Sequence, residues 1–365
     1  MRSRSRNRHR RKRRGRGLLI TLLTLVVVVA VAYPFRQQIA IAAFDLFLSG
    51  TVKNQLEKSY KPSGSASAEP VVYQDEPFSV LLLGTDARPY EKTRGRSDTV
   101  IYAVVRPQES RVLLVSIPRD TYVEIVGHDA DEDGMNDYDK LTHAFAFGEE
   151  EMAINTVEKF LGYEVNNYAT VNFMAIQQVV DAIGGVELPI TEDIVNKNPN
   201  HVQFTIEGGK PIYSGEEALY YIRYREDSDF KRAERQQIFL NAVANRMLNV
   251  NQISQIPELF DIMGENFQTD LHPTSIINLA KQVLTQGNPE ILSFTMMGEG
   301  VRKDDGIFYT EVDEKYYEYS KEMIANWLDP NTTEETLLKP EDFNKEDETE
   351  SDVTESNETV SSQSQ

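Results

Sequence analysis

The sequence predicts an α/β fold in which helices sandwich a mixed central β-sheet, preceded by a single N-terminal transmembrane helix. Strand-like apolar runs occur at 78–84, 98–105 and 111–117, and two of them are almost continuously apolar, as in strands covered on both faces. Helical patterns follow along the chain, and strands mixed with helices are typical of a layered α/β domain. An uncharged run near the N-terminus predicts the transmembrane helix.

The individual elements can be placed from their end signals. The segment RPQES at 106–110 is a connection short enough for the second and third strands to pair as a hairpin. Two of the helical patterns end in glycine, the usual residue just past a helix C-terminus. The predicted helices lie within THAFAFGEEEMAINTVEKFLG, NFMAIQQVVDAIGG, GEEALYYIRYR and DFKRAERQQIFLNAVANRMLN, and a late strand lies within PEILSFTMMG at 289–298.

The N-terminus combines a basic arm with an apolar segment. Residues 1–16 hold nine Arg and one Lys, and residues 17–35 carry no charge over a length that spans a bilayer. A basic flank marks the cytoplasmic side, so we expect a single-pass type II protein of the cell membrane with its folded part outside. A cleaved signal peptide is the alternative, because Ala30-Val31-Ala32 matches A-x-A. The arm could bind nucleic acid, but its position beside the apolar segment favours the membrane, and we expect no nucleic-acid partner.

Composition sets the remaining domain boundaries. After the arm 1–16 and the signal-anchor 17–35, residues 36–77 read as a juxtamembrane stalk and linker that contains the flexible stretch KPSGSASAEP. The extracytoplasmic domain is expected at 78–330, with its core at 78–245, and a disordered acidic tail at 331–365. The chain carries a net charge of −20. It has no cysteine, which excludes disulfides, thiolate metal sites and a cysteine nucleophile.

Two aspartates stand at predicted strand ends. Asp86 follows the first strand and Asp98 opens the second. If these strands are neighbours, both carboxylates emerge at one edge of the sheet, where Mg²⁺ could be bound by one or two carboxylates together with phosphate oxygens. The alternative interpretation is a strand-end cap and an ordinary turn aspartate.

Arginines occur in three separate clusters, each of which follows an apolar strand or opens a helix. Guanidinium forks match phosphate oxygens, so these clusters predict a site for a polyphosphate, with solvated salt bridges as the alternative. In DFKRAERQQ, Asp229, Arg232 and Gln236 stand at positions i, i+3 and i+7 and so share one helix face. We also expect extended or irregular backbone at 222–226, because only then do two arginines two apart face the same way. The arginines and their helical neighbours are Arg88, Arg96, Arg119, Arg223, Arg225, Asp229, Arg232, Arg235 and Gln236.

Other motifs are absent or ambiguous. The chain contains no G-x-x-x-x-G-K-[ST], G-x-S-x-G or H-E-x-x-H, which argues against P-loop nucleotide, serine-hydrolase and zincin chemistry. The segment DADEDGMNDYDK at 129–140 matches the start of a calcium loop, but Lys140 stands where the last glutamate is required. Calcium binding and an acidic surface turn are therefore both open.

Several of these segments, taken in order, resemble the LytR–CpsA–Psr family of cell-wall enzymes. The likeness is strong over 78–245 and weaker to about 328, and it includes a departure at AFAFGEE, 144–150, which lacks the second glycine usual there. The matching pieces are LLLGTDAR, RSDTVIYAVV, VLLVSIPRDTYV, KLTHAFAFG, VDAIGGVEL, GEEALYYIRYRED and DFKRAERQQ.

The resemblance implies an extracytoplasmic phosphotransferase of a Gram-positive cell. Such an enzyme moves a teichoic acid, or a capsular or secondary wall polysaccharide, from an undecaprenyl-pyrophosphate carrier to a sugar hydroxyl of peptidoglycan. It further implies Mg²⁺ held by Asp86 and Asp98, and a pyrophosphate surrounded by Arg88, Arg96, Arg119, Arg223 and Arg225. The segment with Asp229, Arg232, Arg235 and Gln236 would close the site, and an apolar groove would take the prenyl chain.

Two roles in catalysis follow from general chemistry. The attacking hydroxyl needs a base, for which Asp98 and Asp229 are both candidates. Arg225 would stabilise charge on the leaving oxygen. Two other functions stay open: a phosphohydrolase of polyprenyl pyrophosphates that uses water as acceptor, and a non-catalytic wall-binding or regulatory membrane anchor.

Overall fold

The computed structural model describes most of the chain from Ser49 to Phe343. The predicted arm 1–16 and transmembrane segment 17–35 lie outside the described residues, and among those described no helix is long and apolar enough to cross a membrane. The chain divides into two units, residues 1–50 and residues 51–365. The described residues are 42, 49–62, 75–86, 95–130, 132–198, 202–224, 229–247, 262, 266–287 and 289–343.

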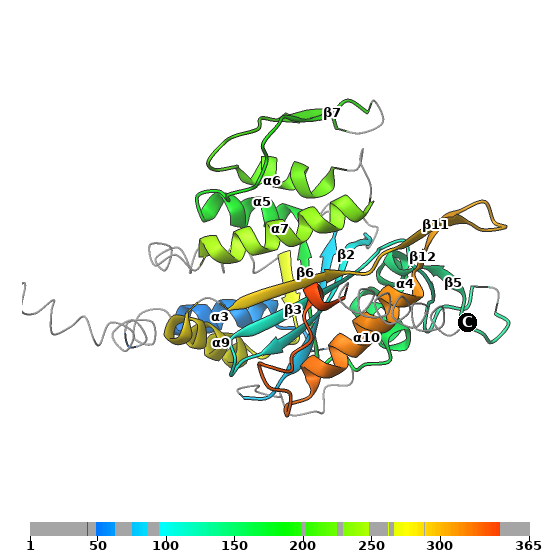
Figure 1. The fold of residues 1–365 in the computed structure, drawn as a ribbon, viewed down its shortest axis with the longest axis horizontal. Coiled ribbons are helices and arrows are strands. Elements are labelled where there is room, and N and C mark those ends of the chain that lie inside the picture. Colours follow the sequence, from blue (N-terminus) through cyan, green and yellow to red (C-terminus); the bar gives the residue numbers. More distant parts are fainter. Residues whose placement is uncertain are drawn as a thin grey trace, which may run out of the picture. The chain divides into compact units, whose positions relative to one another are not determined.

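A mixed six-stranded sheet forms the centre of the second unit, as predicted (Figure 1). The β1, β2 and β3 strands pair antiparallel, so the predicted hairpin between the second and third strands is confirmed. The β6 strand runs parallel to β1, and β10 runs parallel to β3. The strand order is β10-β3-β2-β1-β6-β9, with β1 Phe78–Thr85, β2 Ser97–Arg106, β3 Arg111–Ile117, β6 Asn167–Asn172, β9 Phe267–Thr269 and β10 Glu290–Thr295.

Helices cover both faces of this sheet. Side chains alternate along β2: Val100 and Tyr102 join the core under α4 (Leu141–Leu161) and α10 (Glu314–Leu328). Ile101 and Ala103 join the opposite core, to which α7 (Asp229–Met247) and α9 (Pro273–Gln286) contribute. Because both faces are buried, the strand needs apolar residues at nearly every position, which explains its continuous apolar run.

A second helical layer stands above the sheet. The α5 helix (Phe173–Ala182) and α6 (Gly215–Arg223) pack with α7 in an apolar cluster of their own, and Figure 1 shows the three grouped on one side of the sheet with α10 on the other. The Ser214–Glu217 capping box begins α6. The small pair β7 (Ile194–Asn196) and β8 (Phe204–Ile206) completes this layer.

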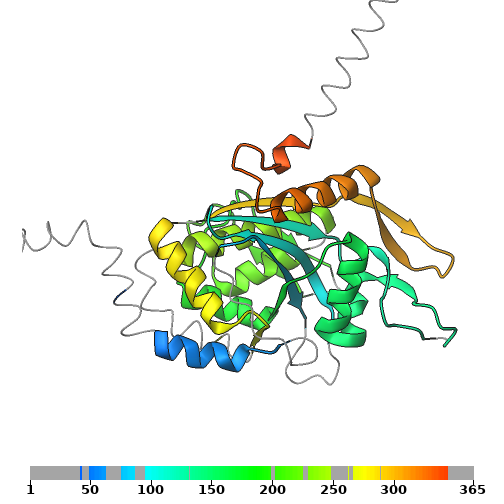
Figure 2. The same ribbon diagram turned by 90° about the horizontal axis from the view of Figure 1, so that it is seen from below.

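Two further hairpins meet beside the ends of β2 and β3. They are β4 (Tyr122–Glu124) with β5 (Tyr138–Lys140), and β11 (Gly298–Arg302) with β12 (Phe308–Val312). A bridge between Thr121 and Thr310 joins them, and Figure 2 shows β11 and β12 extending beyond the sheet.

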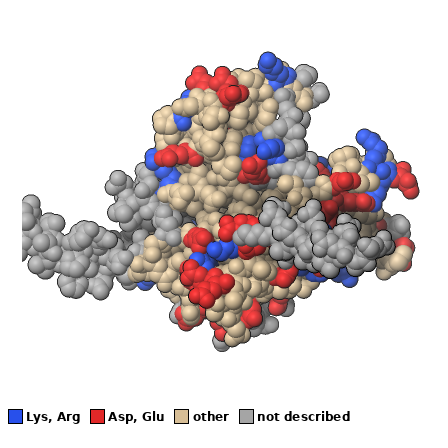
Figure 3. Space-filling view, in the orientation of Figure 1, with Lys and Arg blue, Asp and Glu red and all other residues tan. Residues whose placement is uncertain are grey.

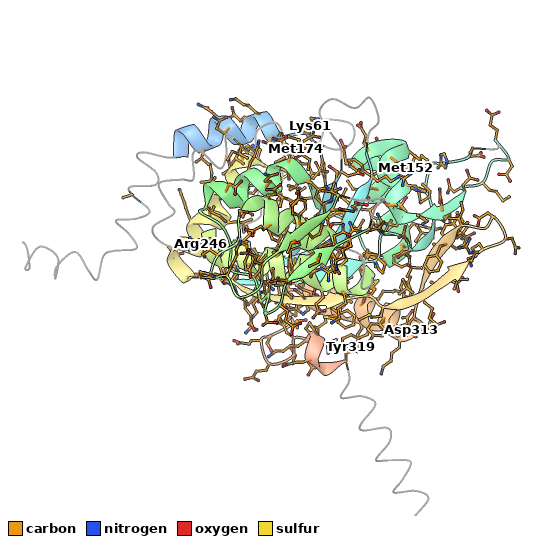
Figure 4. The ribbon with its side chains drawn as sticks, turned by 90° about the horizontal axis from the view of Figure 1, so that it is seen from above. Lys61, Met152, Met174, Arg246, Asp313 and Tyr319 are labelled. Carbon is orange, nitrogen blue, oxygen red and sulfur yellow. The ribbon has the colours of Figure 1, made fainter. Side chains whose placement is uncertain are left out.

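The folded part begins earlier than predicted. The α3 helix (Ser49–Ser59) lies inside the expected stalk 36–77, yet its Val52 and Leu56 are buried. The chain then pairs with β9, since the Lys61 N–H donates to the Thr269 carbonyl at 2.8 Å; Lys61 is labelled in Figure 4. The boundary at Phe78 is therefore wrong, because apolar residues at i and i+4 supply one buried helix face.

The predicted tail also starts too early. Leu337 and Phe343 are buried, and the Trp327 indole N–H donates to the Leu338 carbonyl at 2.8 Å. Tyr319 on α10, labelled in Figure 4, donates its hydroxyl to the Lys339 carbonyl at 2.7 Å. Residues 331–343, including the short 3₁₀ helix η3 (Pro340–Asp342), are thus part of the fold, and the expected tail beyond them lies outside the described residues.

Candidate functional site

One buried carboxylate is held by two arginines at the end of the sheet. Asp98, the second residue of β2, has a side chain only 6% exposed. Its Oδ1 accepts from Arg119 Nη1 at 2.6 Å, and its Oδ2 lies 3.3 Å from Arg232 Nη2. These three side chains come from a strand, the turn after a second strand and a helix, so the tertiary fold brings them together.

Local structure fixes each partner. The β2–β3 register pairs Val100 with Ile117, so the residues just beyond β3 lie beside Asp98. The α7 helix is fastened to the same sheet edge by Gln237, whose Nε2 donates to Ser116 Oγ at 3.1 Å and to Thr295 Oγ1 at 2.8 Å. This attachment presents Arg232 and Gln236, one helical turn apart, to the end of β2.

A chain of alternating charges continues from Arg119. Its Nε lies 3.3 Å from Asp120 Oδ2, and Lys140 Nζ lies 3.0 Å from Asp120 Oδ1. Beyond Lys140, Asp139 Oδ2 lies 2.7 Å from His143 Nδ1. Burial opposes ionisation of Asp139, but its hydrogen bonds to the His143 ring and the Lys140 N–H prevail and lower its pKa. The network holds the Arg119 guanidinium in one place.

The prediction that Asp86 and Asp98 lie at one edge of the sheet is confirmed. Because β1 and β2 are antiparallel partners, Asp86 just after β1 lies at the same edge as Asp98 near the start of β2. Asp86 Oδ1 accepts the Arg96 backbone N–H at 2.6 Å, and the Asp86 N–H donates to the Arg96 carbonyl at 3.1 Å. This carboxylate therefore closes the loop between the strands, and the Arg96 side chain is exposed.

The arginines near α6 lie differently from the prediction. Arg223 is the last residue of α6, so residues 222 and 223 are helical and not extended as expected. Tyr224 is extended, at φ −60° and ψ 134°, and residues 225 and 226 lie outside the described part of the chain. The helix continues to Arg223 because the Tyr224 N–H still donates to the Tyr220 carbonyl, at 3.0 Å. Arg223 is exposed over the Phe173 ring, and Arg235 is buried and donates to the Tyr224 carbonyl at 2.6 Å.

A cavity of about 210 Å³ unites part of the predicted set. Asp98, Arg119, Arg232 and Gln236 line it. Arg88, Arg225 and the side chain of Asp229 lie outside the described part of the chain. Asp86, Arg96, Arg223 and Arg235 are described but do not line it. Sequence reasoning missed the lining residues that the β11–β12 hairpin contributes, because no motif marks a hairpin so far along the chain; they are Gly298, Gly300, Phe308 and Thr310.

A pair of carboxylates suits Mg²⁺ better than Ca²⁺. Within the described residues, no group of three or more His, Cys, Asp or Glu side chains is placed to hold a metal ion. One or two carboxylates completed by water and phosphate oxygens is the usual environment of Mg²⁺, whereas Ca²⁺ takes more protein oxygens. Asp86 lies at the same sheet edge as Asp98 but does not line the cavity, and both Asp98 oxygens are held by arginines, so a Mg²⁺ site at this pair stays a prediction.

The acidic loop forms the exposed link between β4 and β5. Asp129 accepts the Gly134 N–H at 2.9 Å and the Asp133 N–H at 3.1 Å. Asp137 accepts the Ala130 N–H at 2.7 Å. These bonds build a turn among the described residues of the loop, and calcium binding there stays a prediction.

The chain belongs to the LytR_cpsA_psr family, whose model matches residues 46–326. A polyisoprenyl-teichoic acid–peptidoglycan teichoic acid transferase TagU of Enterococcus faecalis is 32% identical over 299 residues, covering 80% of this chain and 93% of that protein. The TagU of Halalkalibacterium halodurans is 35% identical over 281 residues, covering 74% and 88%.

Solved structures share the fold. Protein gbs0355 of Streptococcus agalactiae superimposes with a TM-score of 0.61 at 27% identity, covering 72% of this chain and 91% of its own. A structure of TagT bound to LIIa-WTA has a TM-score of 0.55 at 27% identity, covering 73% and 99%. The predicted family is therefore confirmed, together with its mixed α/β sheet.

Proposed function

We propose that this protein is a phosphotransferase that moves a polyisoprenyl-pyrophosphate-linked teichoic acid to a sugar hydroxyl of peptidoglycan. The single observation that carries the proposal is the buried Asp98 carboxylate, held between Arg119 and Arg232 on one wall of a cavity. A buried ion cluster is weak evidence for stability alone, since an apolar substitute of similar volume is often as stable. Its position on a cavity wall supports a role in binding an anion. The names of the TagU relatives supply the substrate class.

The cavity attracts an anion locally. The chain carries a net charge of −20, and Figure 3 shows acidic and basic side chains interspersed on the face in view. Long-range attraction by a broad basic surface therefore does not bring the substrate to the cavity. Guanidiniums on the cavity wall bind phosphate oxygens through paired N–H donors, and a membrane anchor at 17–35 would keep the enzyme beside its lipid-borne donor.

The proposed reaction exchanges one phosphorus–oxygen bond for another. The acceptor hydroxyl oxygen bonds to the phosphorus that carries the polymer, while the bond from that phosphorus to the bridging oxygen breaks. Polyprenyl monophosphate leaves, and the hydroxyl proton passes to a carboxylate, Asp98 or Asp229. Catalysis of such a transfer consists mostly of positioning and charge neutralisation, which Arg119 and Arg232 can provide, with Arg225 on the leaving oxygen.

Asp86 and Asp98 are the residues that would hold Mg²⁺. When bound, the ion supplies neutralisation of the charge on the phosphate oxygens. The arginines orient the pyrophosphate, and the Asp120–Lys140 pair keeps Arg119 in position.

The test uses the full chain in vesicles with a polyprenyl-pyrophosphate-linked, labelled teichoic acid and peptidoglycan. We expect label covalently attached to peptidoglycan in the presence of Mg²⁺. Arg119→Gln should lower the rate by at least about tenfold, because one oriented donor is lost, and Lys321→Gln on α10, which pairs with Glu318 at the surface, is the matched control. Release of free phosphorylated polymer without attachment would identify a hydrolase, and an unchanged rate in Arg119→Gln would contradict the assigned site.

A further inference from the structure

An aromatic ring lines the same cavity as the charged residues Asp98, Arg119 and Arg232. Phe308, at the start of β12, lines the cavity although its side chain is half exposed to solvent. Residues that stand opposite or two apart on a two-stranded ribbon share one face, and the cavity-lining residues of β11 and β12 obey this rule. That face carries Gly298 and Gly300 on one strand and Phe308 and Thr310 on the other.

Gly300 gives the ring its place. A side-chain carbon added to Gly300 would stand 2.0 Å from Phe308 Cζ, so the ring lies directly over this glycine. Its backbone φ is outside the left-handed region, so the absence of a side chain is required by the ring and not by the turn. The opposite face of the hairpin is filled differently, since Tyr309 is buried against Tyr122 with ring centroids 4.8 Å apart.

We propose that Phe308 is a sugar-stacking residue, on which a pyranose ring rests beside the pyrophosphate site. A pyranose has an apolar C–H face that packs on an aromatic ring, and hydroxyls at its edge that need polar partners. The cavity offers this combination, with the Phe308 ring, the Thr310 hydroxyl and the charged wall within one space. A prenyl chain would need a continuous apolar lining, whereas the apolar residues that line this cavity with Phe308, namely Val100, Ile117 and Pro118, are interrupted by charged groups, hydroxyls and glycines.

The inference rests on the proposed function, because it assigns the sugar to the same transfer reaction. The sugar has two sources: the first residue of the transferred polymer, or the peptidoglycan residue that receives it. Both present the same ring chemistry, and kinetics with each substrate varied in turn distinguishes them.

The experiment compares Phe308→Ala with the parent chain in vesicles. We expect the KM of one glycan substrate to rise roughly three- to tenfold, the loss of one aromatic contact. A rise confined to the polymer-linked donor assigns the ring to the transferred sugar, and one confined to peptidoglycan assigns it to the acceptor. Phe308→Trp should restore the parent KM. Ile307→Ala is the matched control, because Ile307 is as exposed but is not a cavity residue.

A second variant tests the geometry without touching the ring. Gly300→Ala should displace Phe308 and raise the same KM, and it should add nothing further in the Phe308→Ala background, because coupled residues are not additive. Binding of sugar-free polyprenyl pyrophosphate, measured by titration calorimetry, should be the same in all variants. Weaker binding of this sugar-free lipid by Phe308→Ala would overturn the proposal, as would unchanged KM values for both glycans.

The two proposals can fail separately. If the parent chain transfers no polymer, the proposed function fails. Binding of polyprenyl-pyrophosphate disaccharide and of a peptidoglycan glycan fragment then tests Phe308 alone, with weaker binding of either by Phe308→Ala supporting the stacking role and equal binding of both overturning it. If the parent transfers polymer and Phe308→Ala does so with the same constants, only the stacking role fails.

Discussion

The two ends of β2 each bury a guanidinium group, and they bind it in different ways. At the C-terminal end, Arg106 is 1% exposed and donates to the backbone carbonyls of Trp327, Asp329 and Thr332, and to the Glu109 carboxylate. At the other end, Asp98 is held by Arg119 and Arg232, and all three line a cavity.

The partners explain the difference. Main-chain carbonyls at the Arg106 end are neutral and fixed by the fold, so the guanidinium ties the segment after α10 to the sheet, and Arg106 does not line the cavity beside Asp98. Ionic partners at the Asp98 end concentrate charge on a surface that a substrate can reach. The first arrangement stabilises the fold, whereas the second, under the proposed function, binds the substrate at some cost in stability. Substitutions at the two ends should therefore separate folding from activity.

The largest effect is expected from Asp98→Asn. The amide keeps the shape of the side chain but removes the charge that holds Arg119 and Arg232, so turnover should fall by about a hundredfold or more. The transfer rate and a urea unfolding curve are measured on the same preparation. A variant that transfers polymer at the parent rate would place the chemistry elsewhere.

Removal of residues 331–365 should destabilise the protein by about 3–5 kcal/mol, because the burial of Leu337 and Phe343 is lost together with one carbonyl partner of Arg106. Removal of 344–365 alone is the control and should leave the unfolding midpoint unchanged. Equal midpoints for both truncations would show that 331–343 contributes nothing to the fold.

Arg106→Met should lower the free energy of unfolding by about 3 kcal/mol, since carbonyls that accepted from a buried charge lose their donor. Once corrected for the folded fraction, turnover should equal that of the parent, because Arg106 does not contact the cavity. A urea titration gives the first quantity and an initial rate under native conditions gives the second. Lost turnover in a fully folded sample would end the distinction between the two ends of β2.

The sequence predicted the sheet better than the site. Continuous apolar runs identify β1, β2 and β3 because burial on both faces constrains every position, and the hairpin loop at 106–110 then makes β2 and β3 neighbours. Asp98, Arg119 and Arg232 could be named as candidates because Asp98 opens a recognisable strand, Arg119 follows one and Arg232 lies in a helix. Phe308 could not, since the approach of β12 to β3 depends on tertiary packing. The boundaries at Phe78 and Asn331 failed because a few apolar residues, such as Leu56 and Phe343, are enough to attach a polar segment.

The smallest effect, and the only expected gain, is at Glu149. The α4 helix is interrupted at Gly148 and Glu149, and Glu149 has φ 56° and ψ −144°, a conformation that glycine adopts far more readily than other residues. The sequence already stood out here, because AFAFGEE lacks the second glycine expected from the family resemblance. The backbone therefore keeps the shape that a glycine would take and bears the strain of a side chain.

Glu149→Gly should stabilise the protein by about 1 kcal/mol, because the relief of backbone strain exceeds the entropy that glycine adds to the unfolded chain. Glu150→Gly, one residue later and outside the interruption, is the matched control and should destabilise the helix by about 0.5–1 kcal/mol. Neither residue contacts the cavity, so transfer rates should match the parent. Urea unfolding of the two variants decides the point: destabilisation of equal size in both would mean that position 149 bears no strain, and that its left-handed backbone is as favourable for glutamate as for glycine.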